Sequence, residues 1–129
     1  MFDSTSQSIF KFTPDALDLA KWTSPGGLIY EAGSREGHRI MHILAHTVPS
    51  YKVGNHSVFS APRDQIFSLI DQAWALKGAA IPGANGRWVY HVDMSHLPDV
   101  GTSGQKFIRI VVEPGLNGPS NRVVSSFPE

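Results

Sequence analysis

Four of the six histidines of this chain lie in one short stretch, EGHRIMHILAHTVPSYKVGNHSVF, residues 36–59. Three of them, His38, His42 and His46, are spaced four residues apart, a spacing that places side chains on one face of a helix. Imidazole changes its protonation state near neutral pH, so a neutral ring can accept a proton and a cationic ring can donate one. The stretch is therefore the first candidate for chemistry in this sequence.

Metal binding is one interpretation of this spacing. His38 with His42, or His42 with His46, forms an i, i+4 pair that can chelate zinc. The stretch contains no HExxH motif, and Arg39 follows His38 where a glutamate would be needed. Arg35 and Arg39 on the same face would repel a dication. A metal-dependent nuclease and a simple solvated helix face both remain open at this point.

Acid–base catalysis is the third interpretation. When RNA is cleaved by its own 2′-hydroxyl, one group removes the 2′-OH proton and another protonates the leaving 5′-oxygen. A neighbouring cation stabilises the charge that develops on the phosphorus. Histidines beside arginines supply this combination without a cofactor, and they make a metal-independent ribonuclease the favoured function.

Composition limits the classes that remain. A chain of 129 residues predicts one domain, residues 1–129, whose start at residues 1–12 is expected to be loose. The absence of cysteine excludes disulfides, thiolate metal sites and a cysteine nucleophile. Lys+Arg and Asp+Glu are both 11, so a globally basic nucleic-acid binder is not expected, although a local basic patch is. No apolar run reaches the roughly 20 residues that cross a bilayer.

The periodicity of apolar residues predicts the helices and strands that must position the histidines. A helix from about Arg35 or His38 to His46 would bury Ile40, Met41, Ile43 and Leu44. A second helix is predicted between Pro62 and Gly78, and a short one over residues 13–22. Residues 87–94, 106–114 and 121–127 are rich in β-branched and aromatic side chains and predict strands.

Helices followed by strands predict an α+β domain, with the helices on one face of a twisted antiparallel sheet. Alternation along the middle strand places Arg109 on the face away from the helices. The neighbouring residues Ile108, Ile110 and Val112 should then bury against the helices.

The segments GHRIMHILAHT, KVGNHSVF, KFIRIVVEPG and RVVSSFP together resemble the C-terminal toxin domains of bacterial polymorphic and contact-dependent inhibition systems. More narrowly, they resemble ribonuclease toxins of the BECR superfold, which includes barnase, EndoU, colicin ribonucleases and RelE. The resemblance implies an endoribonuclease toxin, with tRNA as the expected substrate, that needs no cofactor. It also implies a cognate immunity protein, in some cases a host protein factor, and delivery within a larger secreted or surface effector that acts in the target-cell cytoplasm.

The resemblance also suggests site residues. The early catalytic histidine maps to His42 or His46, with His38 as the third choice, and the basic residue in the middle of the sheet maps to Arg109. The late hydroxyl maps to Ser125 or Ser126. The expected substrate contacts, besides Ser126, are Arg35, Arg39, Lys52, His56 and Thr102. The rival function of a different class is a non-catalytic binding module.

Overall fold

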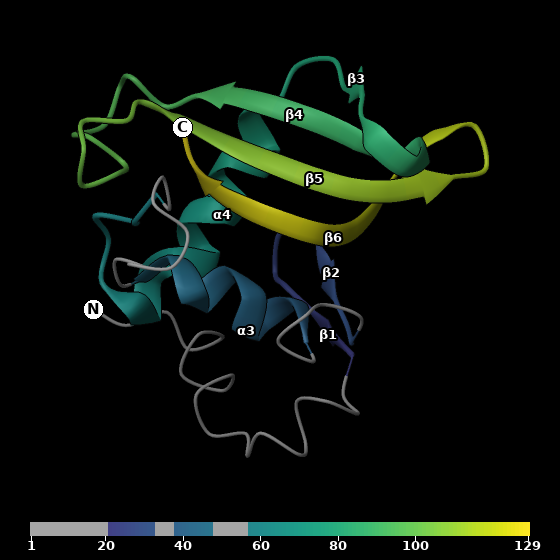
Figure 1. Ribbon diagram of the computed structural model, residues 1–129, viewed down its shortest axis with the longest axis horizontal. Helices are drawn as coiled ribbons and strands as arrows, with labels where there is room; N and C mark the ends of the chain where they lie inside the picture. Colours follow the sequence, from purple (N-terminus) through teal and green to yellow (C-terminus); the bar gives the residue numbers. More distant parts are fainter. Residues whose placement is uncertain (1–20, 33–37, 48–56) are drawn as a thin grey trace.

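A six-stranded open sheet in the order β1-β2-β6-β5-β4-β3 organises the chain (Figure 1). The computed structural model describes residues 21–32, 38–47 and 57–129. Helix α4 (Ile66–Leu76) covers one face of the sheet, and helix α3 (Arg39–Leu44) lies beside β6. The α+β class predicted from the sequence is therefore confirmed.

The three long strands form an antiparallel meander: β4 (Trp88–Asp93), β5 (Phe107–Gly115) and β6 (Gly118–Pro128). They overlap the three predicted strand segments: β4 is one residue shorter at each end than predicted, β5 begins and ends one residue later, and β6 is longer at both ends. The turn between β5 and β6 ends at Gly118, whose φ of 137° is one that side-chain-bearing residues rarely adopt. Val111 pairs with Ser125 and Val112 with Val123, which leaves Val124 as an extra residue, so β6 contains a bulge at this point.

Two short strands at the start of the described part were not predicted, and neither was β3 (Ile81–Pro82). Strands β1 (Trp22–Thr23) and β2 (Ile29–Tyr30) pair antiparallel, and β2 joins β6 in parallel at Ile29 and Arg122. The helix predicted over residues 13–22 is wrong at its end, because Trp22 belongs to β1; residues 13–20 lie outside the described part.

The turn between β1 and β2 is fixed to α4. The carboxylate of Asp71 accepts hydrogen bonds from Ser24 Oγ (2.6 Å) and from the backbone N–H of Gly26 (2.9 Å). A Cβ at Gly26 would lie 2.6 Å from the Asp71 carboxyl carbon. A side chain at this position would therefore displace the Asp71 carboxylate from its hydrogen bonds to the turn.

Helix α4 confirms the second predicted helix. It follows a 3₁₀ turn at Arg63–Gln65, directly after Pro62, and its backbone leaves the helical conformation at Lys77. Its buried residues pack in the main core against the inner face of β4, β5 and β6; they are Ile66, Phe67, Leu69, Ile70 and Ala73. At the other side of β4, the two-residue strand β3 (Ile81–Pro82) adds a short edge.

The two faces of β5 differ as alternation predicts. Ile108, Ile110 and Val112 are fully buried in the main core. On the outer face, Val111 belongs to a separate small cluster with Val89 and Val124. Within the described residues, no helix is both long and apolar enough to span a membrane.

Candidate functional site

His38, the first of the three spaced histidines, has a structural role. His38 is fully buried and has extended backbone dihedrals, and its Nδ1 accepts a 3.1 Å hydrogen bond from the N–H of Ile40. It is therefore the N-cap of α3, which begins at Arg39. The observed helix is therefore shorter than the predicted one. His38 does not share an exposed face with His42, because capping turns its ring toward the protein.

His42 and His46 lie at the other end of the segment. α3 ends at Leu44 and continues as a 3₁₀ turn, Ala45–Thr47, which carries His46. Their ring centroids are 6.2 Å apart in an edge-to-face arrangement. His46 Nδ1 lies 2.8 Å from the carbonyl of Ser57, which can only accept. The proton of the neutral His46 ring is therefore on Nδ1, and the lone pair is on Nε2.

His46 reaches the sheet through an aromatic side chain. Its ring stacks on Phe127 of β6, with centroids 5.1 Å apart and planes inclined by 14°. Phe127 is the cross-strand partner of Arg109 on β5, so the two side chains share the outer face. The Arg109 guanidinium carbon lies 5.6 Å from the Phe127 centroid, within cation–π range.

Arg109 itself carries an unused donor. Its side chain is half-buried, and in the described part of the chain its Nε has no hydrogen-bond partner although the atom is buried. A buried donor without a partner is unusual in native proteins, and each case calls for an explanation. A guanidinium that donates to a bound anion would supply one.

A second histidine lies on the other side of Arg109. His91 of β4 is the cross-strand partner of Arg109, and its Nδ1 contacts the Glu129 carboxylate. Glu129 is held opposite Phe107 by two backbone hydrogen bonds, of 3.0 and 2.8 Å. The His91 side chain is 40% exposed, so it stays accessible while the carboxylate orients it.

These contacts make one row on the outer face: His91, Arg109, Phe127 and His46. Neighbouring strands lie about 4.8 Å apart, so the row spans β4, β5 and β6 at one level. An imidazole stands at each end, and a guanidinium lies between them. Sequence reasoning found Arg109 and His46. His91 lies within the predicted strand 87–94, but no sequence pattern assigns it, Phe127 or Glu129 to the site, because cross-strand register cannot be read from one strand alone.

The predicted hydroxyls lie close to this row but differ in their contacts. Ser126 is fully buried and its Oγ donates a 2.8 Å hydrogen bond to the backbone carbonyl of Arg109. It therefore supports the strand that carries Arg109. Ser125 is 9% exposed and is paired with Val111, two pairs away from Arg109 and Phe127 on β5 and β6.

Thr102 is exposed and lies in a turn joined to the His46 segment. Its N–H donates to the carbonyl of Val58 (2.9 Å), and the next residue, Phe59, donates to the carbonyl of His46 (2.9 Å). This short connection brings the turn and the 3₁₀ segment to the same end of the molecule.

Arg39 belongs to a different part of the surface. Burial lowers the pKa of Arg39, and the positive charge of Arg87 lowers it further, while Glu113 and Glu31 oppose the shift. Three expected contact residues, Arg35, Lys52 and His56, lie outside the described residues. Among the residues that are described, no group of three or more His, Asp or Glu side chains is arranged to hold a metal ion.

Comparison of this chain with protein-family models, with curated proteins and with solved structures finds no match.

Proposed function

We propose that this chain is a metal-independent endoribonuclease that cleaves RNA through attack of the 2′-hydroxyl. The observation that carries the proposal is the row on the outer face, in which His91 and His46 flank Arg109. The chemistry needs two proton-transfer groups and a cation at one phosphate, so the proposal requires the His91 and His46 side chains to turn toward Arg109 when RNA is bound.

The reaction divides among these side chains. One imidazole accepts the 2′-OH proton as the 2′-oxygen bonds to phosphorus, and the other donates a proton to the 5′-oxygen as its bond to phosphorus breaks. The Arg109 guanidinium donates to the phosphoryl oxygens, whose charge grows in the transition state. The products are a 2′,3′-cyclic phosphate and a 5′-hydroxyl.

The biological setting is part of the proposal and rests on the resemblance to bacterial ribonuclease toxins. The chain is proposed to act on tRNA in the target cell, with a host factor in some settings, and to be held inactive in its producer by an immunity protein. Its formal net charge of zero supports recognition of a particular folded RNA over general attraction to phosphate. An immunity protein with acidic side chains would complement Arg109 and bind in a salt-sensitive way.

The test is incubation of the purified chain with total RNA and with tRNA, with and without EDTA, followed by mapping of the new ends. The expected result is cleavage that persists in EDTA and leaves cyclic phosphate and 5′-hydroxyl ends. A 2′-deoxy residue at the cut site should block it. Loss of activity in EDTA with recovery on adding zinc or magnesium would replace this mechanism with a metal-dependent one.

The binding-module alternative is tested by the same preparation. A folded chain that binds RNA or protein but cleaves no RNA would favour it, provided that folding is verified by a cooperative thermal transition. For variants of the residues in the row, the matched control is Lys77→Gln. The Lys77 side chain lies over Trp74 of α4, on the opposite side of the sheet from Arg109.

A further inference from the structure

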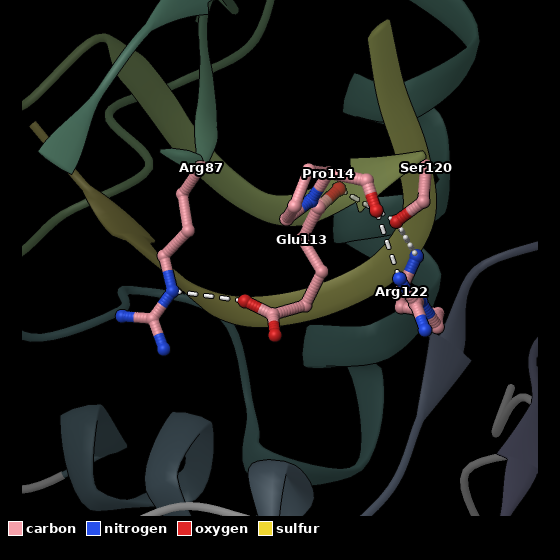
Figure 2. Close-up of polar contacts among 5 residues, drawn as sticks. All are labelled: Arg87, Glu113, Pro114, Ser120 and Arg122. Atoms are coloured by element: carbon pink, nitrogen blue, oxygen red, sulfur yellow. Dashed lines mark hydrogen bonds and ion pairs between the residues drawn. The ribbon is translucent and has the colours of Figure 1, made fainter. Parts of the chain in front are cut away.

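A second cationic group lies on the sheet away from the Arg109 row. Arg87 directly precedes β4, and its Nε forms a 2.9 Å ion pair with the Glu113 carboxylate of β5. Figure 2 shows Arg87 and Arg122 on either side of Glu113, with the Arg87 side chain reaching toward the carboxylate. Arg122 Nη2 donates to the carbonyl of Pro114 at 2.9 Å.

Arg87 keeps most of its donors available. A guanidinium carries five N–H groups, and only the Nε of Arg87 has a side-chain partner among the described residues. The Arg87 side chain is 34% exposed and that of Glu113 is 33% exposed, so the pair borders solvent. One carboxylate therefore orients the guanidinium without enclosing it.

Arg39 of α3 lies within electrostatic reach of Arg87. The positive charge of Arg87 disfavours the charged form of Arg39, in addition to the effect of burial. The carboxylates of Glu113 and Glu31 oppose this effect, so the charged groups around Arg87 include carboxylates as well as guanidinium groups.

The position of Arg87 relative to the row suggests which anion. Arg87, Val89 and His91 alternate along one extended segment, so Arg87 and His91 project from the same face. Four residues of extended chain span roughly 13 Å. A single-stranded RNA backbone covers such a distance in a few nucleotides. The side chains of Val89 and Val111 lie between Arg87 and Arg109 on this face.

We infer that Arg87 forms a phosphate subsite for single-stranded RNA, a few nucleotides away from the bond cleaved beside Arg109. The inference rests on the proposed function, since the distance is counted from the proposed cleavage row. It assigns to Arg87 a role in binding the RNA backbone, and it predicts that the subsite contributes only to substrates long enough to reach it.

The experiment measures binding first, without cleavage. Fluorescently labelled oligonucleotides of two and eight nucleotides, 2′-deoxy throughout and therefore resistant to 2′-OH attack, are titrated with the chain at several salt concentrations. Arg87→Gln should weaken binding of the longer oligonucleotide and leave the shorter one unchanged. It should also reduce the slope of log K against log salt by about 0.7, the value for one phosphate contact on a single strand.

Two further variants make the result specific. Arg87→Gln leaves the Glu113 carboxylate without its partner. The double variant Arg87→Gln, Glu113→Gln removes both charges, so its net charge equals that of the unmodified chain. It should show the same loss of affinity for the longer oligonucleotide as Arg87→Gln. Lys77→Gln removes a positive charge on the helix side of the sheet and should change neither affinity nor slope. Equal behaviour of Arg87→Gln and Lys77→Gln would overturn the subsite.

Cleavage separates this inference from the proposed function. With cleavable RNA of the longer length, Arg87→Gln should raise KM and leave kcat near that of the unmodified chain. Length-dependent loss of binding in a chain that cleaves no RNA would keep the subsite and reject the ribonuclease. Cleavage that is unaffected by Arg87→Gln at every substrate length would keep the ribonuclease and reject the subsite.

Discussion

Arg109 and Phe127 face each other across β5 and β6, with the guanidinium carbon 5.6 Å from the centre of the phenyl ring. The same ring stacks against His46. Phe127 therefore contacts both a guanidinium and an imidazole, and it fixes how far apart these two groups stand. In the proposed reaction it is a positioning residue, because its own side chain has no proton to transfer.

The first prediction concerns this spacing. Phe127→Leu should lower kcat by roughly 10²-fold, the cost of misplacing reacting groups by about 1 Å, with little change in KM. Phe127→Tyr keeps the ring and should retain most of the activity. Steady-state kinetics on a defined RNA measure both values. Equal kcat for the Leu and Tyr variants would show that the ring does not position the site.

The second prediction concerns the cation. Arg109→Gln should reduce cleavage by about 10² to 10³-fold, the effect of removing one donor to a developing oxyanion. Arg109→Lys should recover only part of the rate, since an ammonium cannot reproduce the planar fork of a guanidinium. Lys106→Gln, which removes an exposed charge paired with Asp99, is the control. Cleavage at an unaltered rate in a folded Arg109→Gln chain would eliminate Arg109 from the mechanism.

The third prediction distinguishes the histidines. His46→Ala and His91→Ala should each reduce cleavage by about 10² to 10⁴-fold, the usual contribution of a general acid or base. Glu129→Gln should cause a smaller loss, because it acts only by orienting His91. His42 remains the other candidate for the early histidine. If His42→Ala abolishes cleavage while His46→Ala does not, the row ends at His42 and not at the ring that stacks on Phe127.

The fourth prediction separates structure from chemistry at His38. His38→Asn keeps an N-capping acceptor, whereas His38→Ala removes it and should lower the free energy of unfolding by about 1 kcal/mol, plus the cost of the vacated space. If the role of His38 is only to cap α3, the Asn variant should cleave RNA normally. Thermal unfolding and activity measured on both variants test this. An Asn variant that is stable but inactive would show that His38 takes part in catalysis.

The limits of sequence reasoning in this protein follow from the range of the interactions involved. Alternation of Ile108, Arg109 and Ile110 is local, so both the strand and the outward direction of Arg109 were predictable. β1 and β2 are two residues long, too short to show any period. The contact of His91 with Glu129 joins positions 38 residues apart, and nothing in either local pattern indicates it.

The same limit applies to His38. Its i, i+4 spacing to His42 suggested a shared face, but the helix begins one residue later, at Arg39. Spacing gives a face only inside a helix, and at a helix end the capping hydrogen bond decides where the side chain points.

The fifth prediction concerns Tyr30 and alkaline pH. The Tyr30 ring packs against Trp22 and Phe67, with centroids 5.3 and 5.2 Å away. Its hydroxyl is buried and has no hydrogen-bond partner among the described residues. Burial raises the pKa of Tyr30 well above its usual range, and the negative charge of Asp71 adds to the increase.

Because the folded state disfavours the phenolate, the contribution of Tyr30 to stability is fully present below the pKa of the unfolded chain, about 10. It is lost as the pH rises above that value toward the higher pKa of the folded state. Tyr30→Phe keeps the ring contacts and removes the unpartnered hydroxyl, so it should be neutral or stabilising at pH 7. Its free energy of unfolding should also fall less steeply above about pH 10. Urea unfolding of both chains across that range measures the difference, and parallel alkaline losses in the two chains would show that the Tyr30 hydroxyl is not the group responsible.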